Sequence, residues 1–175
     1  MASRPVSTEY LKAGEDYLAA LQTLGMRPKF LGWGWERATE RWLLVLVTSI
    51  VDAGGPLALN RLLMRAYNAE ATPKSISPFI VTIFSPEIVP SNLYLVGEKF
   101  AKYIIEPRTK ETIDKVPRAE EFTDDKKIQN IQMTFHGIDL EMINSYQNLP
   151  KRDLKYHQRR EEWTKFKRNV EKLAA

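Results

Sequence analysis

The sequence contains no cysteine in 175 residues. That absence excludes a disulfide framework, a cysteine-ligated zinc or iron–sulfur site and a thiol nucleophile. Histidine is also scarce. The chain has two, His136 and His157, and neither has a second histidine three or four positions away. One histidine beside the carboxylate of Asp139 makes a poor metal site. The sequence therefore predicts a protein without a metal centre or a cofactor.

Long hydrophobic runs are absent as well. The longest unbroken apolar run, Trp42 to Val47, is far shorter than the roughly 20 residues of a membrane-spanning helix. The N-terminus carries an arginine but no apolar stretch of the kind found in secretory signals. We therefore expect a cytoplasmic, intracellular chain with no transmembrane segment.

Motifs that would indicate catalysis are missing. Gly32 and Gly34 begin a glycine fingerprint for phosphate binding, but Arg37 stands where its third glycine belongs. Ser77 and Ser85 each precede a proline and do not lie in a nucleophile elbow. The acid pairs Glu120-Glu121 and Asp124-Asp125 lie in a polar stretch. Acidic residues in such a stretch are usually solvated surface charges and not a catalytic pair. We therefore expect a protein that is not an enzyme.

What is present predicts a folded, mainly α-helical chain with a small β component. Hydrophobic residues make up 43% and charged residues 27%, which is close to the average of globular domains. The chain divides into four predicted segments. These are a helical body with a winged-helix-like unit over 1–106, a polar linker or long loop over 107–127, a short mixed segment over 128–150, and a basic amphipathic helix over 151–175.

The first 70 residues of the predicted helical body contain three helices, and a fourth is expected over 98–105. Residues 7–24 have amphipathic spacing, with Ser7 or Thr8 as the N-cap and Gly25 as a stop. Residues 36–53 are almost wholly apolar in their second half, which is typical of a buried central helix. Residues 56–70 begin at a proline and place their leucines on one side. The run from 79 to 84 is either a short helix capped by Ser77 or a strand, because so short a pattern has no decisive period.

The order of these elements over 42–105 resembles winged helix-turn-helix transcription regulators. A buried helix, the turn Gly54-Gly55-Pro56, a second helix and a third apolar segment are followed by an extended run at 93–96 and a Gly-Glu-Lys start of a further helix at 97–99. The resemblance implies a DNA-binding, regulatory protein. The segment in the place of the recognition helix, 75–89, is mostly apolar and has few side chains that could contact base edges.

Positive charge is concentrated at the C-terminus. Residues 151–175 contain nine Lys or Arg against four Asp or Glu, whereas the other 150 residues are close to neutral. Such a local excess attracts polyanions. The predicted phosphate contacts on this segment are Lys151, Arg152, Lys155, Arg159, Arg160, Lys165, Lys167 and Arg168. Arg61, Arg65 and Lys99 are predicted secondary contacts.

The same segment carries an aromatic and apolar stripe at helical spacing. Its candidate interaction residues are Tyr156, Trp163, Phe166 and Val170. Such a stripe buries itself on the body of the protein or on a second copy, which would make a homodimer through this helix.

The leading hypothesis is binding of nucleic acid, DNA rather than RNA, through phosphate contacts. The alternative is a non-catalytic protein–protein interaction module that uses the stripe and the proline-rich centre. Basic amphipathic helices also suit membrane surfaces and calmodulin-like partners.

Overall fold

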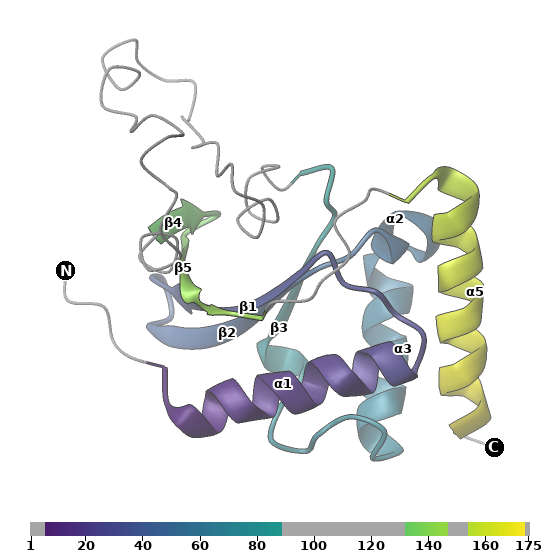
Figure 1. The fold of residues 1–175 in the computed structure, drawn as a ribbon, viewed down its shortest axis with the longest axis horizontal. Coiled ribbons are helices and arrows are strands. Elements are labelled where there is room, and N and C mark those ends of the chain that lie inside the picture. Colours follow the sequence, from purple (N-terminus) through teal and green to yellow (C-terminus); the bar gives the residue numbers. More distant parts are fainter. Residues whose placement is uncertain (1–5, 89–131, 147–153, 174–175) are drawn as a thin grey trace, which may run out of the picture.

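The computed structural model describes residues 6–88, 132–146 and 154–173, and its central feature is one mixed five-stranded sheet (Figure 1). The elements are α1 (Thr8–Thr23), β1 (Phe30–Glu36), β2 (Arg41–Val47), α2 (Ile50–Gly54), α3 (Pro56–Asn68), the 3-10 turn η1 (Pro78–Ile80), β3 (Val81–Phe84), β4 (Gln132–Phe135), β5 (Ile138–Ser145) and α5 (Tyr156–Leu173). The strand order is β3-β2-β1-β5-β4. Strands β2 and β3 are parallel, and the other pairs are antiparallel.

This sheet shows that the prediction of a mainly helical fold with a winged-helix-like unit is wrong; the architecture is α/β. The apolar half of the predicted helix over 36–53 is strand β2, and only its end, Ile50–Gly54, is helical. Strand β2 lies between β1 and β3, and its residues from Leu43 to Val47 are buried on both faces of the sheet. A strand covered on both faces loses its polar alternation, so its sequence resembles that of a buried helix.

Strand β1 occupies the glycine-rich segment that has no clear strand pattern in sequence. Its two glycines lie on one face, where side chains of neighbouring residues take the space. A Cβ at Gly34 would overlap Ile138 and lie 2.7 Å from Cδ2 of Leu140, and one at Gly32 would lie 2.8 Å from Cζ of Phe30. The glycines therefore let side chains from β1 and β5 close over the strand.

Several local predictions are confirmed. The N–H of Tyr10 donates to Oγ of Ser7 (3.2 Å), which caps α1. Gly25 follows α1 with a positive φ of 94°. Helix α3 begins at Pro56, directly after Gly55 with its φ of 82°. Both alternatives for 79–84 occur in succession: Ser77 caps the short turn η1, and strand β3 follows at once.

The helices cover one face of the sheet and form the main core with it. Figure 1 shows α1 running across the sheet, and α5 standing beside α2 and α3. The core combines inward side chains of β1 and β2 with those of the helices. Its largest fully buried members are Trp33, Tyr17, Phe166, Leu21, Met26, Leu31, Leu44, Leu46, Ile50, Leu59, Leu63 and Ile76.

A second, smaller apolar cluster lies on the other face of the sheet. Its buried members are Phe30, Leu43, Val45, Val47, Ile138 and Leu140. The rings of Phe84 on β3 and Phe135 on β4 meet at 5.0 Å, although these strands are the two ends of the sheet order. The sheet is therefore strongly coiled, and its ends approach each other over this cluster.

Some predictions concern parts of the chain outside the described residues. These are the polar linker over 107–127 and the extended run and helix expected over 93–105. The start of the predicted C-terminal helix, 151–153, also lies outside them; α5 begins at Tyr156 and ends at Leu173.

Candidate nucleic-acid interface

Helix α5 is docked on the protein by its aromatic and apolar stripe. Phe166 and Val170 have no exposed surface and belong to the main core. Trp163 lies directly over Gly54 at the end of α2, where a Cβ would overlap the indole ring. The stripe thus packs on the protein's own body. Only Tyr156, at the start of the helix, stays outside this contact, with 69% of its surface exposed.

Polar contacts fix α5 to the end of α1. Nδ2 of Asn169 donates to the carbonyl of Leu24 (2.9 Å), which is the C-cap residue of α1. The N–H of Arg27 donates to Oε1 of Glu162 (2.6 Å). These bonds satisfy backbone groups that a helix end and its following turn leave unpaired. The rotation of α5 about its own axis is therefore set by packing and by hydrogen bonds together.

Glu162 gives this contact a pH dependence. Burial raises the pKa of its carboxyl, and the hydrogen bond from Arg27 opposes that shift only in part. A raised pKa means that the folded state binds the proton more tightly than the unfolded chain, so the wild type gains stability as the pH falls and Glu162 becomes protonated.

Glu162→Gln keeps an acceptor for Arg27 and does not titrate. We expect its stability relative to wild type to be highest at pH 7 and to decline towards pH 4, measured by urea unfolding. A rise in the stability of Glu162→Gln relative to wild type between pH 7 and pH 4 would contradict this assignment.

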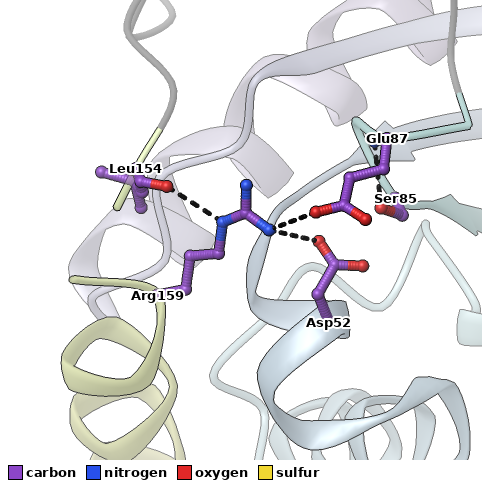
Figure 2. A network of polar contacts seen from close by, with 5 residues as sticks. All are labelled: Asp52, Ser85, Glu87, Leu154 and Arg159. Carbon is purple, nitrogen blue, oxygen red and sulfur yellow. Dashed lines mark hydrogen bonds and ion pairs between the residues drawn. The ribbon is translucent and has the colours of Figure 1, made fainter. Parts of the chain in front are cut away.

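Arg159 clamps the start of α5 to the body of the protein (Figure 2). Its Nη1 lies 2.6 Å from Oε1 of Glu87 and 3.4 Å from Oδ2 of Asp52, and its Nε donates to the carbonyl of Leu154 at 3.0 Å. Its side chain is 19% exposed. The carboxylates of Asp52 and Glu87 compensate the charge of Arg159. From the sequence this arginine is grouped with the phosphate contacts, but in the structure it pairs with residues of the same chain. Sequence alone gives no signal for this pairing, because residues 52, 87 and 159 are far apart in the chain.

The outer face of α5 and the residue before it carry the exposed positive charge. The exposed cations are Lys155, Arg160, Lys165, Lys167, Arg168 and Lys172. Two exposed carboxylates, Glu161 and Glu171, accompany them. Among the residues that the structure describes, one of these cations forms an ion pair, that of Lys167 with Glu171 at 3.9 Å. The other five are exposed on, or directly before, a helix whose inner face is fixed by packing.

A shallow hollow lies on this outer face. It has a volume of about 340 Å³. Its lining includes Arg160, Glu161, Thr164, Lys165 and Arg168. The methylenes of Lys165 lie over Gly25, about 3.2 Å from where a Cβ would stand, which holds this side chain at one edge of the helix. Oγ1 of Thr164 donates to the carbonyl of Arg160 (2.8 Å). Three cations against one carboxylate make the hollow suitable for an anion.

The remaining predicted phosphate contacts do not all lie on α5 within the described residues. Arg61 and Arg65 are exposed on α3, a helix that packs beside α5. Lys99, Lys151 and Arg152 lie outside the described residues. The interface that the structure describes therefore rests on α5 and Lys155.

Within residues 6–88, 132–146 and 154–173 no group of three or more His, Asp or Glu side chains could hold a metal ion. Likewise, none of the helices described is both long and apolar enough to cross a membrane. His136 lies in the turn between β4 and β5, where its ring stacks on Phe84 at 5.7 Å. His157 is exposed on α5.

Comparison with known proteins adds no further assignment. No protein-family model matches the chain, and neither the curated proteins nor the solved structures give a match.

Proposed function

We propose that the protein binds nucleic acid through phosphate contacts from the outer face of α5. The observation that carries the proposal is the exposure of six cations, against two carboxylates, on one docked helix and the residue before it. Because the backbone of α5 is already held by packing, only the side chains of these cations lose freedom when phosphates bind, and their combined field steers a polyanion towards them. Arg159 is not among these ligands, because Asp52 and Glu87 already pair with it.

The alternative, a protein–protein interaction module, has less support from the geometry. It relies on the aromatic stripe of the C-terminal helix, together with the proline-rich centre, as the surface for a partner. Trp163, Phe166 and Val170 instead pack against Gly54 and the main core of the same chain. A partner could reach them only if α5 left the body, which would expose two fully buried side chains.

Salt dependence of binding tests the proposal. We expect fluorescence anisotropy with labelled DNA to give a Kd on the order of 10⁻⁶ M at about 50 mM salt and much weaker binding at about 200 mM. Replacing Arg160 and Arg168 by glutamine removes two cations of the hollow. We expect this double variant to bind roughly tenfold more weakly and its salt slope to fall by about 1.5 to 2 units, the contribution of two phosphate contacts.

The matched control removes two exposed cations elsewhere. Lys12 on α1 and Arg41 at the start of β2 are both exposed, and their ion pairs are with Asp16 and Glu36, which lie outside α5. Lys12→Gln with Arg41→Gln changes the net charge by the same amount, and we expect affinity and salt slope to stay close to wild type. Equal losses in the two double variants would mean that net charge alone drives binding. Point variants are needed because deleting residues 151–175 would remove Phe166 and Val170 from the core.

A further inference from the structure

A single row of side chains runs along the exposed side of α5. Its members are four residues apart: Tyr156, Arg160, Thr164, Arg168 and Lys172. Residues at this spacing form one ridge on a helix surface, and each step along it rises about 6 Å. All five side chains are exposed. The ridge therefore places one aromatic ring at one end of a line of three cations.

Tyr156, at the aromatic end of the ridge, is more exposed than the other aromatic residues of this helix. Trp163 and Phe166 on the same helix pack into the protein, whereas Tyr156 exposes 69% of its surface. The guanidinium of Arg160 lies over the Tyr156 ring, 5.9 Å from its centroid. Most of the Tyr156 ring is therefore available to a ligand. An exposed ring next to a cation suits a ligand that has both an aromatic face and a negative charge.

We propose that the ridge binds single-stranded nucleic acid, with an unpaired base stacked on Tyr156 and backbone phosphates on Arg160 and Arg168. Unpaired bases present their faces to a protein, whereas the bases of a duplex are stacked on one another and cannot reach an exposed ring without being extruded. Stacking on an aromatic side chain tolerates any base, so the contact requires little sequence specificity. This assignment rests on the proposed function and adds the class of nucleic acid.

Paired variants of Tyr156 test the assignment on the full chain. The probes are a labelled mixed-sequence single-stranded DNA of about 15 nucleotides and the duplex made from it. We expect wild type to bind the single strand more tightly than the duplex at equal salt. Tyr156→Ala should weaken single-strand binding about tenfold and change duplex binding less than twofold. Tyr156→Phe, which keeps the ring, should bind like wild type. The salt slope of Tyr156→Ala should match that of wild type, because no phosphate contact is removed.

The outcomes separate the two proposals. If neither probe binds at low salt, nucleic-acid binding itself fails and the ridge assignment fails with it. If both probes bind equally and Tyr156→Ala has no effect, the basic face of α5 remains a phosphate-binding surface and the base-stacking assignment is overturned. Competition by heparin as effective as that by the single strand, or preferential binding to anionic lipid vesicles, would also overturn it. Thermal unfolding of each variant checks that the fold is intact, which the exposure of Tyr156 leads us to expect.

Discussion

Phe166→Ala is expected to lower the free energy of unfolding by about 3–5 kcal/mol, which is the usual cost of truncating a fully buried phenylalanine. The side chain has no exposed surface and belongs to the main core. It is the central contact by which α5 packs on the protein, and Val170 and Trp163 lie on the same stripe. Urea unfolding followed by circular dichroism and by tryptophan fluorescence measures the loss.

The neighbouring residue provides the control for this prediction. Lys167 is exposed on the same turn of α5 and has a weak ion pair with Glu171. Lys167→Ala should change stability by less than about 0.5 kcal/mol. If Phe166→Ala costs no more than this control, α5 does not pack on the core as described. A loss of helical signal before the fluorescence transition would show that α5 detaches as a separate unit, which would contradict its place in one cooperative core.

The elements with strong local signals could be predicted from the sequence. Helices α1 and α3 have amphipathic spacing and clear end signals, at Ser7 and Gly25 for the first and at Pro56 for the second. The stripe on α5 also follows from spacing, because Phe166 and Val170 are four residues apart on one helical face. Its packing on the protein's own body, in place of a second copy, is seen only in the structure.

The sheet could not be predicted in the same way. Strand β2 is apolar on both faces, and strand β1 contains Gly32 and Gly34, residues that usually weaken a strand. Strands β1 and β2 pair with each other as a hairpin, and each also pairs with residues far along the chain, such as Leu44 with Val81 and Gly34 with Leu140. Pairing over such separations leaves no local pattern, and a helix prediction for 36–53 is the natural result.

The candidate interface could be predicted in part. The excess of Lys and Arg after residue 150 and the helical spacing of the stripe are both visible in the sequence. The partner of Arg159 is not, since its two carboxylates come from α2 and from the residues after β3. The ridge from Tyr156 to Lys172 has a regular spacing of four, but its exposure became evident only when the packing of α5 was known.

Gly14→Ala is expected to destabilise the protein by about 2 kcal/mol or more, although helix propensity alone would make it stabilising by about 1 kcal/mol. Gly14 lies in the middle of α1, and a Cβ there would overlap the hydroxyl of Tyr146 and lie 2.5 Å from its Cζ. That hydroxyl donates to the carbonyl of Leu11 (2.7 Å) and accepts from Nε1 of Trp33 (3.0 Å). Burial raises the pKa of Tyr146 to about 12, so it remains a donor at neutral pH. Moving the ring would break both bonds.

A double-mutant cycle isolates this steric cause. In a Tyr146→Ala background the ring is gone, so Gly14→Ala should meet no obstacle and should stabilise α1 by about 0.5–1 kcal/mol. The sign of the Gly14→Ala effect therefore reverses between the two backgrounds, with a coupling of about 3 kcal/mol. Urea unfolding of the four proteins measures it. A Gly14→Ala effect with the same sign in both backgrounds would mean that Tyr146 does not pack over Gly14, and that β5 is not held to α1 by this contact.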